Sequence, residues 1–533
     1  MKKITQTQLV LFTTFFLIAF DNYMFFTNLI KTYPLSENFW FVVSVAIVLF
    51  FATLLFLLLV TNRWIIKPVL ILILIISSMT NYFMNTYNVV IDDSMIRNSM
   101  QTDMHESLDL LSMKQLLYFI ILGLFPSILV YKVKLEKRTF KEEVLSKLKL
   151  IGISIAVIVA MVVIFSKGYT SFVREHKPLR FTANPLYWIY SSGKYINKTF
   201  NGGPIVVQKI GEDAKIIRSK DDGRHKLVIM VVGEAARADH FSLNGYERDT
   251  NPLLSKEPDV INFSNVSSCG TSTAESVPCM FSFYDKDNFT YKRGIDTENV
   301  LDVLKHTKNI AILWRDNNSD SKGVALRVDY EWYKYPNNNT ICTDGECRDV
   351  GMLVGLDDFI KKNKDKDILI VLHQMGNHGP AYYKRYPKDF EKFEPVCKTN
   401  QLEECSKQEI VNAYDNAILY TDYFLDQVIH FLKKYDDQYD TAMIYMADHG
   451  ESLGEKGVYL HGLPYFMAPD AQTHIGALMW FGKGMQKEID LRRLKQKSSE
   501  KFSQDNLFHI LLGLFDVRTS LYNKKMDILH NDN

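Results

Sequence analysis

Hydrophobic positions divide the 533-residue chain into two parts. Before residue 167, apolar runs approach the roughly 20 residues that cross a bilayer core. After residue 225, short apolar runs alternate with polar turns and amphipathic segments, a pattern typical of strands and helices in an α/β sheet. The predicted membrane-spanning helices cover residues 9–30, 39–60, 64–83, 116–131 with its flanks, and 150–166. We therefore expect a five-helix transmembrane domain at 1–166 and an α/β domain at 226–533.

Loop charges predict the orientation of the spans, because basic residues concentrate on the cytoplasmic side. Two lysines precede the first span, Arg63 and Lys67 lie between the second and third, and seven basic residues lie between the fourth and fifth. The N-terminus is therefore expected in the cytoplasm. With five spans, the chain after Ser166 is expected on the side of the membrane that faces away from the cytoplasm.

All six cysteines lie in the part that is expected to be exported: Cys269, Cys279, Cys342, Cys347, Cys397 and Cys405. An even number in an oxidising compartment indicates disulfides rather than free thiols. Six cysteines allow 15 connectivities, and the close grouping into three pairs favours bridges between nearest neighbours. A zinc-thiolate site is the alternative, but the spacings are wide and no CxxC motif occurs.

The connector at 167–225 mixes aromatic and basic side chains, which suits the headgroup zone of a bilayer. We interpret it as interfacial helices followed by a linker near residues 201–204. A solvated linker throughout is the alternative.

The second part contains apolar runs at residues 227–232, 310–314, 368–372, 443–446 and 477–481, with an amphipathic segment at 409–432. Runs of this length are typical of buried parallel strands. Ligands of such sheets gather at the carboxyl ends of the strands.

Polar residues follow several of these runs directly. Glu234 follows the first run, Asp448 and His449 follow another, His373 and His378 follow the run at 368–372, and 315–322 is almost entirely polar. Carboxylate and imidazole groups together suit Zn²⁺. We therefore predict a metal site at this edge, although Asp448-His449 alone could form a capping turn.

The segment at 267–279 is rich in hydroxyl groups and is framed by two cysteines. A hydroxyl at a helix N-terminus could meet phosphate there, once a metal or base activates it. Composition does not choose among Thr271, Ser272 and Thr273, and a plain Ser/Thr-rich loop is the alternative.

Five strings together resemble the lipid A phosphoethanolamine transferases, including the mobile colistin-resistance enzymes. They are VVGE from Val231, CGTSTA from Cys269, WRDNNSDSK from Trp314, HQMGNHGP from His373 and DHGESLGE from Asp448. The resemblance covers essentially the whole chain. It implies an alkaline phosphatase/sulfatase-like α/β fold for the soluble domain.

The resemblance also implies roles for individual residues. Zinc ligands fall on Glu234, Thr273, Asp448 and His449, and Thr273 is also the nucleophile that becomes phosphorylated. One zinc site is implied firmly, with room for a second near His378 and His461. The substrate-contacting positions that it implies are Asn98, Thr102, Glu106, Ser319, Lys322, His378 and His461. The implied disulfides join Cys269 to Cys279, Cys342 to Cys347 and Cys397 to Cys405.

Two departures from related patterns affect the prediction. The family commonly has Thr after the metal-binding Glu, whereas this chain has Ala235, which suggests that a hydrogen bond beside the metal is missing. Sulfatases carry their modified nucleophile in Cys/Ser-x-Pro-x-Arg, and the matching string from Ser276 ends in Met280. Sulfatase activity is therefore disfavoured.

The resemblance implies transfer of phosphoethanolamine from phosphatidylethanolamine to lipid A, which confers polymyxin resistance. A related transferase with another acceptor, such as a core sugar or a surface protein, or a phosphoglycerol transferase, is the alternative. A lipid receptor without turnover or a transporter would have no use for the nucleophile. Nucleic acid is not an expected partner, because 62 basic residues nearly balance 61 acidic ones.

Overall fold

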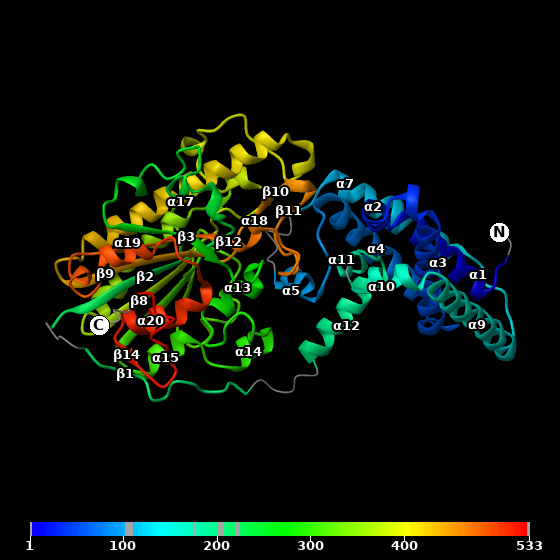
Figure 1. Ribbon diagram of the computed structural model, residues 1–533, viewed down its shortest axis with the longest axis horizontal. Helices are drawn as coiled ribbons and strands as arrows, with labels where there is room; N and C mark the ends of the chain where they lie inside the picture. The colour runs from blue at the N-terminus through cyan, green and yellow to red at the C-terminus, as the bar shows by residue number, and fades with distance from the viewer. Residues whose placement is uncertain (1–2, 102–109, 175, 201–205, 219–222, 530–533) are drawn as a thin grey trace. The chain divides into compact units, whose positions relative to one another are not determined.

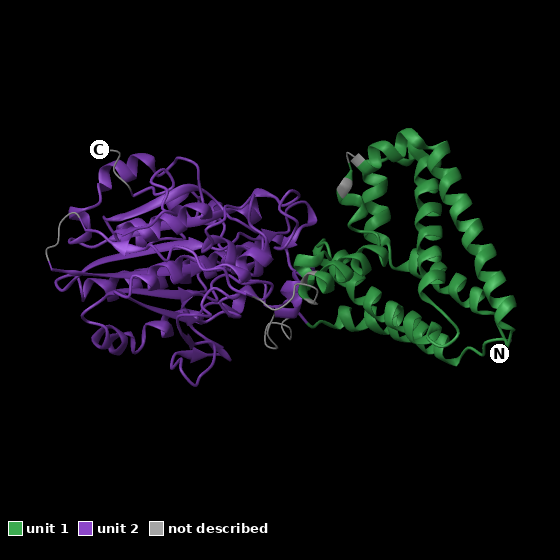
Figure 2. Ribbon diagram, turned by 90° about the horizontal axis from the view of Figure 1, so that it is seen from below, with its two compact units in different colours: residues 1–96, 111–199 green, residues 97–110, 200–533 purple. Residues whose placement is uncertain are grey.

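The computed structural model describes residues 3–101, 110–174, 176–200, 206–218 and 223–529 (Figure 1). The chain folds into two compact units, which Figure 2 shows in separate colours. Unit 1 comprises Met1–Ile96 and Leu111–Thr199, and unit 2 comprises Arg97–Leu110 and Phe200–Asn533.

Unit 1 is built from helices. They are α1 (Gln6–Phe20), α2 (Tyr23–Thr32), α3 (Leu35–Val60), α4 (Ile66–Tyr87), α7 (Met113–Tyr118), the π-helical η1 (Phe119–Leu124), α8 (Phe125–Lys132), α9 (Phe140–Ile164), α10 (Ser166–Arg174), α11 (Lys177–Arg180) and α12 (Leu186–Phe200), while α5 (Asp93–Gln101) runs from unit 1 into unit 2. Four stretches are long and apolar enough to cross a bilayer: α3, α4, α7–α8 and α9. A fifth is obtained if α1 and α2 count as one span, although they are bent by 57°.

The first predicted span is divided by two polar residues at the bend. α1 ends before Asp21, whose Oδ1 accepts a hydrogen bond from Asn81 of α4. Asn22 donates from Nδ2 to the carbonyls of Leu17 and Asn184 at 3.0 and 2.7 Å. These bonds replace the interrupted helix ladder in a buried setting. Among the described residues, the five expected spans therefore correspond to four unbroken helices and one bent pair, which makes the fifth span if α1 and α2 cross the membrane together.

The last predicted span begins earlier than its apolar run. α9 starts at Phe140 because Thr139 and Glu142 form a capping box, which lets the helix begin among lysines. The connector after it contains α10, α11 and α12. The predicted linker near 201–204 lies outside the described residues.

Unit 2 contains an eight-stranded sheet. Its strands are β2 (His225–Gly233), β3 (Val260–Ser267), β4 (Ile310–Asp316), β5 (Asp329–Trp332), β8 (Asp367–His373), β9 (Tyr439–Ala447), β12 (His474–Phe481) and β13 (Phe502–Ser503). The spatial order is β13-β3-β12-β9-β2-β8-β4-β5, and β12 runs antiparallel to both of its neighbours. The other pairs are parallel, so seven strands end at the same edge of the sheet.

All five strands predicted from apolar runs are confirmed, as β2, β4, β8, β9 and β12. Residues 226–233 of β2 and all of β9 are buried, which explains their continuous hydrophobicity. The short pairs outside the main sheet are β1 (Lys215–Ile216) with β14 (Val517–Arg518), β6 (Cys342–Thr343) with β7 (Glu346–Cys347), and β10 (Ser452–Leu453) with β11 (Tyr459–Leu460).

Helices cover both faces of the sheet, and Figure 1 shows α17 on one side with α15 and α20 on the other. The helices of unit 2 are α13 (Thr273–Met280), α14 (Tyr291–Asp296), α15 (Val300–His306), α16 (Leu356–Lys362), α17 (Lys407–Lys433), α18 (Asp470–Thr473), α19 (Leu491–Lys497) and α20 (Leu507–Leu514). α17 confirms the amphipathic helix predicted at 409–432, and its start is fixed by a capping box of Ser406 and Glu409.

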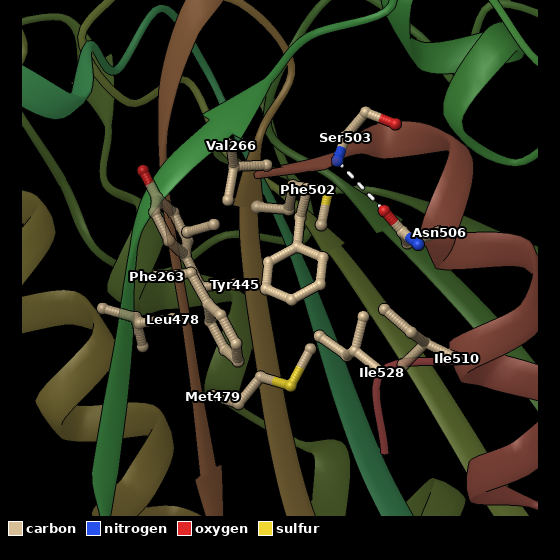
Figure 3. A pocket seen from close by; sticks show the side chains of 12 residues that line it. Phe263, Val266, Tyr445, Leu478, Met479, Phe502, Ser503, Asn506, Ile510 and Ile528 are labelled. Carbon is tan, nitrogen blue, oxygen red and sulfur yellow. Dashed lines mark hydrogen bonds between the residues drawn. The ribbon is translucent and has the colours of Figure 1, made fainter. Parts of the chain in front are cut away.

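The core of unit 2 has a small gap between β3, β12 and α20 (Figure 3). Its lining includes Phe263, Tyr445, Met479, Phe502 and Ile510. A volume of about 10 Å³ is that of a single water-sized sphere, and the walls are almost entirely apolar. We interpret it as a packing defect rather than a ligand site.

Candidate active site and metal centre

Four predicted site residues meet at the carboxyl edge of the sheet. Glu234 follows β2, Asp448 and His449 follow the adjacent β9, and Thr273 is the first residue of α13, which follows β3. Glu234, Asp448 and His449 are fully buried, and Thr273 is only 4% exposed. Parallel strands that end at one edge bring together residues far apart in sequence.

The reactive atoms of these residues converge on His449 Nε2. Glu234 Oε1 and Asp448 Oδ2 each lie 3.4 Å from it, and Thr273 Oγ1 lies 3.5 Å from it. Thr273 also donates from Oγ1 to Glu234 Oε2 at 3.1 Å. Two carboxylates, an imidazole and a hydroxyl therefore surround one point.

Each carboxylate uses one oxygen for the protein and directs the other into the cluster. Asp448 Oδ1 accepts from the backbone N–H groups of Ala235 and His449 at 3.1 and 2.7 Å. Glu234 Oε2 accepts from Asn318 Nδ2 at 2.9 Å. Glu234 Oε1 and Asp448 Oδ2 are buried and have no hydrogen-bond partner among the described residues.

The His449 ring is oriented in the same way. Nδ1 lies 2.8 Å from the carbonyl of Gly450, so it carries a hydrogen and Nε2 faces the carboxylates, where loss of the Nε2 proton would leave a lone pair for a metal ion. Such a backbone partner for the second nitrogen is usual for a metal-binding histidine. The donor set of two carboxylate oxygens, one imidazole nitrogen and one hydroxyl fits a tetrahedral Zn²⁺ site.

The electrostatics of the cluster favour an added cation. Burial, with the Glu234 charge added to it, raises the pKa of Asp448 to about 6. Burial alone would lower the pKa of His449, but the two carboxylates outweigh it and raise that pKa to about 10. Buried carboxylates are costly without a positive partner, so the pair attracts positive charge, which the imidazolium form of His449 supplies when no ion is bound.

Ala235 contributes to the site through its main chain, while its side chain offers no hydrogen-bond donor or acceptor. Its side chain is apolar and buried, but its backbone adopts a left-handed conformation (φ 52°) in which N–H holds Asp448 Oδ1. The main chain therefore orients the ligand, whichever side chain stands at this position.

The geometry chooses among the three hydroxyls that composition left open. Thr271 Oγ1 donates to the carbonyl of Leu463 at 2.6 Å, and Ser272 is the N-cap residue of α13. Thr273 Oγ1 alone of the three lies in the cluster. Its position at a helix start also places backbone N–H groups beside the hydroxyl.

Two further predicted histidines lie beside the cluster. The rings of His461 and His449 are 4.3 Å apart, and those of His461 and His378 are 5.8 Å apart. His461 Nδ1 bonds Glu451 Oε2 at 2.7 Å, and Glu451 also accepts from the Tyr382 hydroxyl at 2.6 Å. Ligand atoms of His449, Glu451 and His461 are close enough to share an ion.

Ser319 and Lys322 lie on the polar loop after β4. Lys322 Nζ donates to Ser319 Oγ at 2.8 Å and is only 4% exposed. Asn318, in the same loop, touches Glu234 and so joins the loop to the cluster. Asn98 lies on α5, whereas Thr102 and Glu106 lie outside the described residues.

His373 has a structural role and, unlike His378, does not lie beside the carboxylate-imidazole cluster. Its Nδ1 lies 2.9 Å from Asp316 Oδ2, which also accepts from the Trp314 indole at 2.8 Å, and all three are buried. This pair holds the start of the polar loop behind the site.

Sequence reasoning missed Asn318, Glu451 and Tyr382 as site neighbours. Asn318 and Glu451 lie within the strings WRDNNSDSK and DHGESLGE, and that position was the only sequence feature that could have identified them as site neighbours. Tyr382 had no signal, because its contact with Glu451 joins loops 69 residues apart.

The structure pairs the six cysteines as their spacing favours: Cys269 with Cys279, Cys342 with Cys347, and Cys397 with Cys405.

Comparisons with known proteins agree with this architecture. Residues 226–517 match the family model described as sulfatase, and residues 49–200 match the model described as phosphoethanolamine transferase EptA/EptB. The chain is 48% identical to phosphatidylethanolamine transferase Mcr-1 of Escherichia coli, over 94% of this chain and 93% of that one. It is 38% identical to phosphoethanolamine transferase EptA of Escherichia coli K12, over 98% and 96%.

A solved structure matches the whole length. The integral membrane protein lipooligosaccharide phosphoethanolamine transferase A from Neisseria meningitidis is 35% identical and covers 99% of both chains, with a TM-score of 0.95.

Proposed function

We propose a reaction for this chain on the premise that it belongs to the phosphoethanolamine transferase family: it moves phosphoethanolamine from phosphatidylethanolamine to a phosphate of lipid A. Relatives named phosphatidylethanolamine transferase Mcr-1 and Kdo(2)-lipid A phosphoethanolamine 7''-transferase support this donor and this kind of acceptor. The observation that carries the proposal is the position of Thr273 Oγ1, 3.1 Å from Glu234 Oε2 and 3.5 Å from His449 Nε2.

Glu234, Asp448, His449 and Thr273 would hold Zn²⁺. When bound, the ion lowers the pKa of a coordinated hydroxyl and offsets charge that develops on phosphate oxygens. The residues around His461 leave room for a second ion, but the proposal requires only the ion held by Glu234, Asp448, His449 and Thr273.

In the first step, Thr273 Oγ1 attacks the phosphorus of phosphatidylethanolamine. The bond to the diacylglycerol oxygen breaks, and phosphoethanolamine becomes esterified to Thr273. Glu234 Oε2 already accepts the hydroxyl hydrogen and is placed to take that proton. His461 or His378 supplies a proton to the departing diacylglycerol oxygen, within the range of a general acid near neutral pH.

In the second step, a lipid A phosphate oxygen attacks the same phosphorus, and the phosphate gives its proton to the histidine that was left neutral in the first step. The bond to Thr273 breaks, the Thr273 oxygen takes back its proton from Glu234, and the acceptor leaves with the group. Lys322, held by Ser319, supplies a positive charge for the transferring phosphate. The added ammonium group reduces the negative charge of lipid A, which weakens the binding of cationic peptides such as polymyxins.

Both substrates are lipids, which accounts for apolar helices on the same chain as a soluble enzyme. We propose that residues 1–166 anchor the chain in a bacterial inner membrane with the N-terminus in the cytoplasm. Residues 167–225 then connect the anchor to a periplasmic catalytic domain at 226–533.

The test is mass spectrometry of lipid A from a host without its own transferases, expressing either this chain or its Thr273→Ala variant. A phosphoethanolamine mass increment with the intact chain alone supports donor, acceptor and nucleophile together. An inserted, folded chain that yields no increment would refute the lipid A assignment and direct the search to other envelope acceptors.

A further inference from the structure

Gln504 is a buried side chain that joins two loops of the candidate site. It is fully buried and opens η11 (Gln504–Asn506), directly after β13. Its Oε1 accepts from the backbone N–H of Cys269 at 2.7 Å. Its Nε2 donates to the carbonyls of Ala447 and Asp448, both at 2.8 Å.

These partners lie on the two loops that carry the proposed nucleophile and the proposed metal ligands. Cys269 opens the loop that ends at the nucleophile Thr273, and Asp448 is a predicted ligand that precedes His449. The strands that carry the two loops, β3 and β9, are not neighbours, because β12 lies between them. No ladder hydrogen bond can join β3 to β9, and the Gln504 carboxamide bridges that gap at the edge of the sheet.

Gln504 is itself held firmly. Ser503 and Asn506 form a capping box around it, with Ser503 N–H donating to Asn506 Oδ1 at 3.0 Å (Figure 3). β13 also pairs in parallel with β3, where Ser503 lies opposite Ser267, two residues before Cys269. These contacts hold the backbone of Gln504 beside the loop that begins at Cys269, so its carboxamide has a fixed position from which it also bonds the carbonyl of Asp448.

We propose that Gln504 is a positioning residue, which sets the distance between the Thr273 hydroxyl and the carboxylate-imidazole cluster. This rests on the proposed function, in which that hydroxyl attacks phosphorus. Misplacement of a reacting group by about 1 Å can cost about 100-fold in rate. A single side chain with hydrogen bonds to both loops prevents such a displacement.

The test compares Gln504→Met with Asn416→Leu in the purified full-length protein. Both substitutions replace the carboxamide with an apolar group on a side chain of similar length. Asn416 is also fully buried and bonds three backbone groups, the N–H groups of Lys392 and Phe393 at 2.9 Å and the carbonyl of Phe393 at 3.0 Å. None of these partners belongs to the site, so the control reproduces the stability cost alone.

We expect both variants to lower the unfolding temperature by similar amounts. Gln504→Met alone should lower kcat for phosphoethanolamine transfer by about 10- to 100-fold, with KM for phosphatidylethanolamine within about two-fold of wild type. In metal-free protein, hydrogen exchange at the amides of residues 269–273 should accelerate in Gln504→Met and stay unchanged in Asn416→Leu. Unchanged kcat in Gln504→Met, or an equal loss in both variants, would overturn the proposal.

The wild-type protein gives a test that depends on no variant. The Cys269 amide should be among the slowly exchanging amides of unit 2, and fast exchange there would overturn the hydrogen bond to Gln504. If wild type transfers no phosphoethanolamine, the proposed function fails, and the exchange measurement still decides whether the bridge exists.

Discussion

Protonation of His509 is expected to destabilise unit 2 as the pH falls. His509 lies on α20, is 7% exposed, and its Nδ1 accepts a hydrogen bond from the backbone N–H of Asn523 at 3.2 Å. Burial lowers the pKa of His509 to about 4, from an ordinary value of 6.5. The folded state therefore keeps this histidine neutral over a range in which the unfolded chain takes up a proton.

The sign and size follow from that difference. Above pH 6.5 the side chain is neutral in both states, and it contributes no pH dependence. Between pH 6.5 and 4 the unfolded state binds the extra proton, so the free energy of unfolding falls by about 1.4 kcal/mol per pH unit. At pH 5 the loss is about 2 kcal/mol, and below pH 4 it levels off at about 3 kcal/mol.

The assay is thermal unfolding of the full-length protein and its His509→Gln variant between pH 7.5 and 5. Glutamine keeps an acceptor for Asn523 N–H but does not titrate. About 2 kcal/mol corresponds to about 3 °C in a unit of this size, so the wild-type transition should drop about 3 °C further than that of the variant. Equal acid shifts in the two proteins would refute the reasoning.

Three further predictions concern the metal, the core and the substrate. Asp448→Asn removes a charged ligand and should reduce bound zinc by at least about 10-fold in elemental analysis, whereas zinc retained at wild-type level would exclude Asp448 as a ligand. Gly351→Ala should destabilise unit 2 by about 1–3 kcal/mol, because its Cβ would stand 1.8 Å from Asn339 Oδ1. Gly193→Ala, with open space around its Cβ, is the control and should be neutral or stabilising in thermal unfolding. Lys322→Ala should lower kcat/KM for transfer by about 10- to 100-fold, and an unchanged value would remove Lys322 from phosphate binding.

The sequence was most informative for elements whose burial produces a recognisable hydrophobic pattern within the element itself. The five predicted strands and α17 were recovered within a few residues, because burial on both faces or on one helix face imposes a periodic pattern. Glu234, Asp448 and His449 were found because polar residues directly after buried strands are conspicuous.

Predictions failed where a distant partner overrides the local pattern. The apolar run at 9–30 reads as one helix, but Asn184, more than 160 residues away, accepts a hydrogen bond from Asn22 at the break between α1 and α2. β3 was not predicted, because it alternates buried and partly exposed residues and so has no continuous apolar run. It is held in the sheet by its pairing with β12 and β13.

The sequence by itself indicated the apolar helices and the α/β pattern, favoured the pairing of neighbouring cysteines, and pointed to the carboxylates and imidazole proposed to bind metal, because each depends on residue type and short spacing. Only the tertiary structure decided which hydroxyl reaches the cluster, that the main chain of Ala235 holds Asp448, and that Gln504 spans the gap left by β12. These depend on the order of strands in space. Contacts across that order join residues tens to hundreds of positions apart, for which the local pattern carries no signal.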